Sequence, residues 1–325
     1  MSPKPFAKFA KKWMFKSRPR KQGGFTLLEL LVAILIGGIL VNGLLFLVIE
    51  LMTVNNREES LTQTQQNTRR AIDYITRDVG ESIFVYSDLT NLMTELSDEP
   101  TGTPVLAFWR LDPLTNDEVT ALTTFCASAT GAAKDECETL LVRQNYYTLV
   151  AYFQQDNTGT DIWEGPTRII RYELPNYTSI STTALTVPTG YADPTLLVPG
   201  VATPTFNSFD AWQAGGATTD GNAAVLTDFV NVNDVSVTTL CPTPANLTST
   251  YARLPATSDS FYVCVEQPNG IANDLSSNRS LIVYLQGNAS KDVNQVVGVS
   301  ESSGLPKLQS EVLIRGVIQN DATSE

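Results

Sequence analysis

One apolar stretch constrains this chain more than any other part of it. Between Phe25 and Ile49 there is a single charged residue, Glu29, and the stretch begins directly after Gly23-Gly24. As a helix it is long enough to cross the ~30 Å hydrocarbon core of a bilayer. A carboxylate inside such a helix is costly unless it has a partner. We therefore expect a membrane-spanning helix whose one acid has a function.

The start of this stretch reads Gly24-Phe25-Thr26-Leu27-Leu28-Glu29-Leu30-Leu31-Val32-Ala33. This run resembles the class III signal of type IV prepilins and type II secretion pseudopilins. The resemblance implies that a prepilin peptidase cuts after Gly24 and that the new first residue, Phe25, is methylated. It also implies that Glu29, the fifth residue of the mature chain, takes part in filament assembly.

Two simpler interpretations explain less. A secretory signal peptide needs a short apolar region followed by a small-x-small cleavage site. Here the apolar region is longer, and the residues that follow it are Thr53-Val54-Asn55-Asn56-Arg57. A plain membrane anchor explains the length, but it requires neither Gly24 nor Glu29. The prepilin interpretation accounts for the length, the glycine and the acid together.

Charge divides the chain at the same point. Residues 1–24 contain eight basic side chains and no acid. The remaining residues hold 14 of the 22 basic side chains and all 34 acidic ones, which gives a formal charge of −20. A basic segment before a membrane span stays in the cytoplasm. We therefore expect a single-pass protein with a cytoplasmic N-terminus and the acidic part outside. The prepilin resemblance implies that the membrane is the bacterial inner membrane and that the acidic part is a periplasmic head. We expect no broad surface that binds nucleic acid, since such a surface would be basic.

The cysteines all lie in the part placed outside the cytoplasm, where disulfides persist. Four cysteines allow three connectivities, and the compartment makes four buried thiols the weaker alternative. The pairing that closes the shortest loops joins Cys126 to Cys137 and Cys241 to Cys264. There is no Cys-x-x-Cys spacing, so we expect no metal site.

Histidine is absent from the chain. This excludes Ser-His and Cys-His catalytic arrangements and every histidine-based metal site. No spacing among the 34 acids singles out a catalytic pair. The sequence therefore predicts neither an enzyme nor a cofactor.

The fold that we expect is α+β and pilin-like, with a long N-terminal helix packed on a β-rich head. No proline occurs from Phe25 to Glu99, and the helix should span residues 25–80 and end near Gly80. The segment 1–24 is then a cleaved leader, and the head covers 81–325. Beyond Met52 the helix becomes polar and then carries one apolar stripe, formed by Leu61, Ala71, Ile72, Ile75, Val79 and Ile83.

The head contains segments rich in Val, Ile, Tyr, Phe and Thr, separated by turn residues. The residues from Gln155 to Asp161 read as a hairpin turn and lack the acid spacing of a calcium loop. The predicted strands are Val105–Arg110, Leu140–Phe153, Thr167–Glu173, Phe229–Thr238, Phe261–Glu266, Ser280–Leu285 and Glu311–Ile318.

Residues 175–225 differ in composition, because prolines punctuate a stretch rich in Thr, Ala, Gly and Asn. We expect a long irregular excursion on the surface of the head. Phe206, Phe209 and Trp212 should dock this excursion onto the head; the alternative is an exposed contact patch.

A second resemblance concerns the helix segment from Gln65 to Asp78, in which an Arg-Ala-x-Asp run precedes an Arg-Asp pair. It resembles the matching helix of PilW- and PulJ-type minor pilins, and the long basic leader with a large acidic head also resembles cyanobacterial pseudopilins tied to polysaccharide secretion. The resemblance implies a minor pilin or pseudopilin that enters or primes a type IV pilus or a type II secretion-like pseudopilus. Its partners would be other major and minor pilins and an inner-membrane assembly platform. The alternative is an adhesin whose head binds a glycan or a surface.

Overall fold

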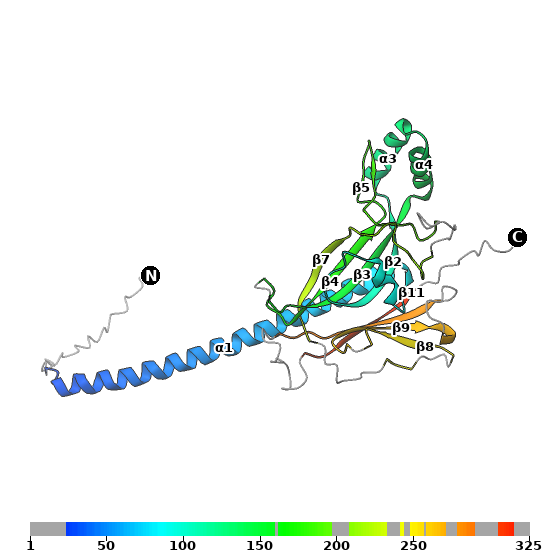
Figure 1. Ribbon diagram of the computed structural model, residues 1–325. Helices are drawn as coiled ribbons and strands as arrows, with labels where there is room; N and C mark the ends of the chain where they lie inside the picture. The colour runs from blue at the N-terminus through cyan, green and yellow to red at the C-terminus, as the bar shows by residue number, and fades with distance from the viewer. Residues whose placement is uncertain are drawn as a thin grey trace, which may run out of the picture. The chain divides into compact units, whose positions relative to one another are not determined.

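The computed structural model describes residues 24–159, 162–196, 208–232, 241–243, 248–256, 258–270, 278–289 and 305–314 (Figure 1). The chain divides into two compact units between Asn56 and Arg57. The first unit contains the apolar stretch, and the second contains the head with the last turns of the long helix.

The long helix α1 spans Leu27–Gly80 and ends at the residue that the sequence predicts. In the head unit, its buried face includes Ala71, Ile72, Ile75 and Val79, so this part of the predicted apolar stripe is confirmed. The assignment of Ile83 to the stripe is wrong, because the chain turns after Gly80 and Ile83 lies in the first strand.

The larger sheet of the head is antiparallel, and its strand order is β1-β2-β3-β4-β7. Strands β3 and β4 are joined by the loop that contains the predicted turn, whereas longer insertions separate the other neighbouring strands along the chain. The strands are β1 (Ser82–Val85), β2 (Thr103–Pro113), β3 (Asn145–Asp156), β4 (Thr167–Pro175) and β7 (Asn222–Val230).

The smaller sheet is also antiparallel, with strand order β11-β10-β9-β8. A short 3-10 helix, η1 (Pro268–Gly270), follows β9. The strands are β8 (Thr250–Leu254), β9 (Phe261–Gln267), β10 (Arg279–Leu285) and β11 (Leu308–Ile314).

The main core of the head forms where α1 and one face of each sheet meet. Ile75 and Val79 of the helix are fully buried there. Each sheet contributes alternate residues, as expected for strands with one face toward a core, except at Val105 and Leu106, where the register of β2 shifts. The sheet residues include Val105, Leu106, Phe108, Val150, Tyr152, Val263, Val265, Leu281 and Val283.

The opposite face of the larger sheet is covered by the irregular excursion and by α2 (Thr90–Glu95). Phe209 and Trp212 are buried in this second core, and the Trp212 indole N–H donates to the carbonyl of Ala192 at 2.8 Å. The predicted docking is therefore confirmed for these two residues, while Phe206 lies outside the described residues. The excursion also contains a short hairpin, β5 (Ser179–Ile180) and β6 (Leu185–Thr186).

Two helices between β2 and β3 correct the sequence analysis. They are α3 (Asn116–Ser128) and α4 (Ala132–Arg143), so the predicted strand Leu140–Phe153 is wrong for its first residues. Its strand part begins only at Asn145, because Gln144 adopts a left-handed conformation that ends α4. Leu140 is buried as a helix residue between α3 and α4 rather than in a sheet.

Four of the other strand predictions are confirmed, and the prediction Phe229–Thr238 is wrong at Asn231 and Val232, which follow the end of β7. Segments 105–110, 167–173, 261–266 and 280–285 lie in β2, β4, β9 and β10. Strand β7 ends at Val230, so the prediction from Phe229 onward catches only its last two residues; positions 233–238 lie outside the described residues. Strand β11 holds the predicted residues up to Ile314, and positions 315–318 also lie outside the described residues.

Candidate functional site

Thr26, the residue that follows Phe25, caps the N-terminal end of α1. The Thr26 hydroxyl accepts the backbone N–H of Glu29 at 3.2 Å, and the Thr26 carbonyl accepts the N–H of Leu30 at 3.2 Å. A threonine in this position supplies an acceptor for one of the free N–H groups of the first turn. The same geometry places Glu29 in that first turn, where the helix dipole favours a negative charge.

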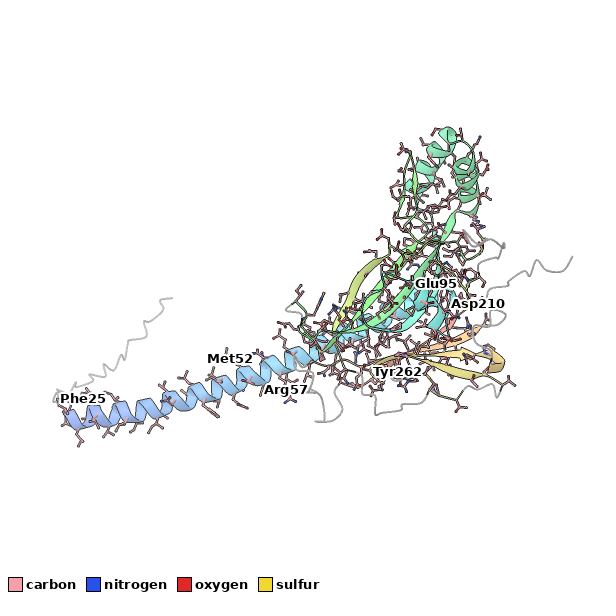
Figure 2. The ribbon with its side chains drawn as sticks, in the orientation of Figure 1. Phe25, Met52, Arg57, Glu95, Asp210 and Tyr262 are labelled. Carbon is pink, nitrogen blue, oxygen red and sulfur yellow. A yellow bond between two sulfur atoms is a disulfide. The ribbon has the colours of Figure 1, made fainter. Side chains whose placement is uncertain are left out.

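Gly24 and Phe25 lie just outside the helix, and Figure 2 labels Phe25. The side chain of Phe25 is 80% exposed. A Cβ added at Gly24 would meet no atom within 4 Å. Within the part of the chain that the structure describes, no packing contact therefore requires glycine at position 24.

Among the described residues, the apolar part of α1 is exposed along nearly its whole length. One window of α1 is long and apolar enough to cross a membrane, and none of its residues is buried. Large side chains such as Leu28, Ile39 and Phe46 are more than 70% exposed. Exposed apolar surface of this extent indicates contact with lipid or with other proteins.

Glu29 has no cation near it in this stretch of sequence. The next basic residue along the helix is Arg57, 28 positions later. At ~1.5 Å per residue this is a distance of ~42 Å along the helix. A cation that pairs with Glu29 must therefore come from the segment before Phe25, from the chain terminus or from another molecule.

One family model matches the N-terminal region of the chain. Residues 19–41 match the model described as the prokaryotic N-terminal methylation motif. The chain carries a class III prepilin signal. The signal indicates a type IV pilin-like protein, which is a structural subunit and not an enzyme. It implies processing by a prepilin peptidase and assembly with other pilins. Neither the curated proteins nor the solved structures give a match.

The head of this pilin-like protein is fastened to α1 by a buried ionic network. Asp78, near the end of α1, accepts hydrogen bonds from Arg110 of β2 at 2.6 Å and from Arg171 of β4 at 2.7 Å. The Tyr152 hydroxyl of β3 also donates to Asp78, at 2.5 Å. Glu173 pairs with both arginines. One carboxylate of the helix thus contacts three consecutive strands of the larger sheet.

The network determines the protonation of Asp78. Burial alone would raise the pKa of this carboxyl, since its side chain is only 4% exposed. The hydrogen bonds from Arg171 and Tyr152 and the charges of both arginines outweigh burial, so the pKa of Asp78 lies below its ordinary value. Asp78 is therefore a charged, fully partnered anchor. The resemblance drew attention to the Arg77-Asp78 pair, but sequence reasoning missed this role.

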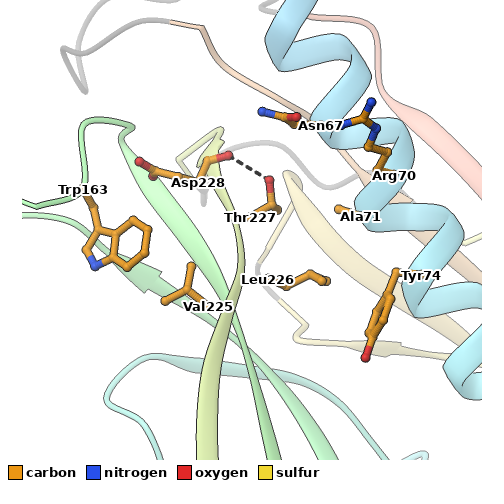
Figure 3. Close-up of a pocket in the computed structure, with 9 residues that line it drawn as sticks. All are labelled: Asn67, Arg70, Ala71, Tyr74, Trp163, Val225, Leu226, Thr227 and Asp228. Atoms are coloured by element: carbon orange, nitrogen blue, oxygen red, sulfur yellow. Dashed lines mark hydrogen bonds between the residues drawn. The ribbon is translucent and has the colours of Figure 1, made fainter.

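A groove of about 410 Å³ opens on the head between the last turns of α1 and strand β7. Figure 3 shows Trp163 on one side, Arg70 and Tyr74 of α1 on the other, and Val225 between them. Trp, Tyr and Arg carry most of the binding energy in protein interfaces, so the groove has the composition of a protein-contact surface. The full lining is Asn67, Arg70, Ala71, Tyr74, Trp163, Val225, Leu226, Thr227 and Asp228.

Asp228 holds one wall of this groove in place. Its carboxylate accepts the backbone N–H groups of Glu164 and Gly165, each at 3.0 Å. The Asn157 amide donates to the same carboxylate at 2.7 Å. These bonds tie the β3–β4 loop, and with it Trp163, to the end of β7.

Both disulfides that the sequence analysis expected are present. Cys126–Cys137 joins α3 to α4, and Cys241–Cys264 joins the segment 241–243 to the middle of β9. The first lies in a small core of its own with Leu122 and Leu140. The second lies on the outer face of the smaller sheet.

Removal of either disulfide should destabilise the head. The loops span 11 and 23 residues, and closing loops of this length removes about 3 kcal/mol of unfolded-state entropy in the chain-entropy model. We expect Cys126→Ser with Cys137→Ser, and separately Cys241→Ser with Cys264→Ser, to lower the free energy of unfolding by about that amount. Denaturant titration measures the loss. Peptide mapping without reductant should show the two links; a Cys137–Cys241 link would contradict the assignment.

Proposed function

We propose that this pilin-like protein is a minor pilin or pseudopilin that assembles into, or primes, a type IV pilus or a type II secretion-like pseudopilus. One observation carries the proposal: a lone carboxylate, Glu29, stands in the first turn of a bare apolar helix, directly after Gly24-Phe25. A membrane anchor by itself would be more stable with leucine at this position, because the charge is costly in lipid.

In this proposal, prepilin peptidase cuts after Gly24 and leaves 301 of the 325 residues. The open space around the Cα of Gly24 supports this role, since the fold places no demand on the residue. Phe25 becomes the first residue of the mature chain and carries a methylated α-amino group. This amino group is the one cation that the cut creates at the depth of Glu29.

The carboxylate of Glu29 then pairs with the α-amino group of Phe25 on a neighbouring subunit. Two unpaired charges in an apolar filament core would each be expensive, and pairing removes most of that cost. The cation cannot come from farther along α1, because Arg57 lies ~42 Å away. Assembly is thus favoured only when the charged ends of two helices come together.

The topology that goes with this function places the basic residues 1–24 in the cytoplasm and the acidic head in the periplasm. Two disulfides in the head fit an oxidising compartment. The inner-membrane assembly platform and other major and minor pilins or pseudopilins are the partners. The large head, with its long excursion from 175 to 225, fits a low-copy tip or priming subunit better than a major fibre subunit.

Processing provides the first test of the proposal. Mass spectrometry of the membrane-extracted protein should find a mature chain that begins at methylated Phe25. Gly24→Ala should be cut nearly as well as the parent, whereas Gly24→Leu should accumulate with its leader intact. A Cβ at position 24 would meet none of the described residues within 4 Å, so we attribute a difference between the two variants to the peptidase. A leader retained in the parent chain, or a cut after Met52, would contradict the proposal.

A further inference from the structure

A hollow of about 610 Å³ lies on the outer face of the smaller sheet, on the side away from the main core. The strand register explains its floor. Tyr251 of β8 is opposite Glu266 of β9, and Ile282 of β10 is opposite Glu311 of β11. Because side chains alternate between faces, these residues share the outer face with Ser280 and Tyr284. Ligand pockets typically measure 300–1,000 Å³, so the hollow is large enough to hold part of another molecule.

A disulfide builds one wall of this hollow. Cys264 occupies the centre of the outer face and is fully buried beneath its partner, Cys241. The bond fixes the segment that begins at Cys241 above the sheet, and Pro242 and Thr243 of this segment line the hollow. The wall is therefore covalently attached to its floor.

Two carboxylates are held at the hollow by the same residue. The backbone N–H of Ser280 donates to Glu266 at 2.9 Å, and the Ser280 hydroxyl donates to Glu311 at 2.6 Å. The described lining residues, which also include Gln309 and Ser310, contain no lysine or arginine. Among the residues that the structure describes, the hollow thus presents two oriented negative charges and no positive one.

On the same face, two cationic side chains of this chain lie over an aromatic ring. The guanidinium of Arg253 lies 4.5 Å from the centre of the Tyr262 ring, and the Lys307 ammonium lies 5.1 Å from it. Tyr262 is stacked on Tyr284, with ring centres 4.6 Å apart. Within the described residues, the cation contacts of this face are both on Tyr262, whereas Tyr251 and Tyr284 line the hollow. Figure 2 labels Tyr262 on this sheet.

We propose that this hollow binds a lysine or arginine side chain of a partner protein. Tyrosine faces attract a cation through their negative quadrupole, and Glu266 and Glu311 supply the opposite charge. The formal charge of −20 beyond the leader adds long-range attraction for a basic partner. The surface is distinct from the Glu29 site, so the inference holds whether or not Glu29 directs assembly.

The test uses the full mature chain in detergent micelles and two short peptides. One is acetyl-Gly-Arg-Gly-Arg-Gly-amide, and the other has citrulline, a neutral isostere, in place of both arginines. Ring resonances of labelled tyrosine locate the binding during the titration. The arginine peptide should shift Tyr251 and Tyr284 and bind at least about tenfold more tightly than the citrulline peptide, as expected for hydrogen bonds to charged groups.

Variants distinguish the contribution of the hollow to peptide binding from the contribution of the overall negative charge. Glu266→Gln with Glu311→Gln should weaken the arginine peptide about tenfold. Asp117→Asn with Glu138→Gln removes two exposed carboxylates from α3 and α4, and it should change the affinity less than about twofold because exposed charges act weakly at a distance. Tyr251→Leu keeps both carboxylates and should weaken binding about two- to fivefold. Peptide mapping without reductant should recover the linked Cys241–Cys264 peptide from each variant, which checks that this wall of the hollow has formed.

Three results would overturn the inference. Equal affinity for the two peptides would show that charge is not recognised. An equal loss in the α3–α4 control would show that only the overall charge matters. Tighter binding of a glucosamine tetramer, lost in the Glu266 and Glu311 variant, would assign the hollow to an amino sugar in place of a protein.

Discussion

The variant Glu29→Leu should be cut, methylated and inserted in the membrane like the parent chain, and yet it should be depleted from fibres by about 100-fold or more. Leucine removes the partner of the Phe25 amino group and leaves that cation unpaired in an apolar core. Removing one member of a buried charge pair typically costs about 3–5 kcal/mol, which corresponds to a factor above 100. The measurement compares the membrane-bound and sheared-fibre fractions of each variant.

Two further variants define the cause. Glu29→Asp keeps the charge and shortens its reach, so its incorporation should be intermediate. Glu50→Leu removes the acid at the opposite end of the apolar stretch, and it should enter fibres like the parent because it stands 25 positions from Phe25. If Glu29→Leu enters fibres, or supports their initiation, as well as the parent does, charge pairing is wrong. The carboxylate would then serve another step, such as recognition by the methylating activity.

The second large effect concerns Asp78. Asp78→Asn should lower the free energy of unfolding of the head by about 3–5 kcal/mol, because Arg110 and Arg171 would lose the buried carboxylate that both contact. They would keep only Asp112 and Glu173, which are more exposed. Asp73→Asn is the matched control: it changes the same residue type one turn earlier on the exposed face of α1, and its effect should stay within about 0.5 kcal/mol. Denaturant unfolding measures both. Equal stability of the Asp78 and Asp73 variants would show that the network is not an anchor.

The low pKa of Asp78 also predicts a pH dependence. A carboxyl whose pKa is lower in the folded chain than in the unfolded chain stabilises the fold fully above its unfolded pKa. The contribution is lost as the pH falls through the lower, folded pKa. The parent should therefore lose stability from about pH 4 downward, where an unfolded aspartate begins to bind protons. Asp78→Asn should show a smaller loss over the same range, and an identical acid profile would contradict this contribution.

The N-terminal signal could be predicted because its information is local. Gly24, Phe25 and Glu29 lie within six consecutive positions, inside the matched motif of residues 19–41. The cap by Thr26 follows from the same short segment. By contrast, the anchor at Asp78 depends on residues 32 and 93 positions away, Arg110 and Arg171, and no local pattern specifies that pairing.

The start of helix α3 has a local sequence signal that the strand-based interpretation of this region does not use. Thr115 and Glu118 form a capping box, a Thr-x-x-Glu pattern that marks the start of a helix. The β-branched and aromatic residues after Leu140 favour a strand, so the sequence alone predicts the start of β3 at Leu140, five residues before its actual start at Asn145. The hollow on the smaller sheet required the register of β8 to β11, which joins residues from 251 to 311 and cannot be read from any one segment.

In the proposed filament, the apolar part of α1 packs against the corresponding helices of other subunits that carry the N-terminal methylation motif. A photo-crosslinking phenylalanine in place of Phe46, whose side chain is 73% exposed, tests this contact in intact cells. We expect adducts with other chains that carry the N-terminal methylation motif, and we expect these adducts to be lost when Glu29→Leu is introduced in the same chain. Adducts with lipid alone, or an unchanged set of protein adducts in the Glu29→Leu chain, would contradict this packing.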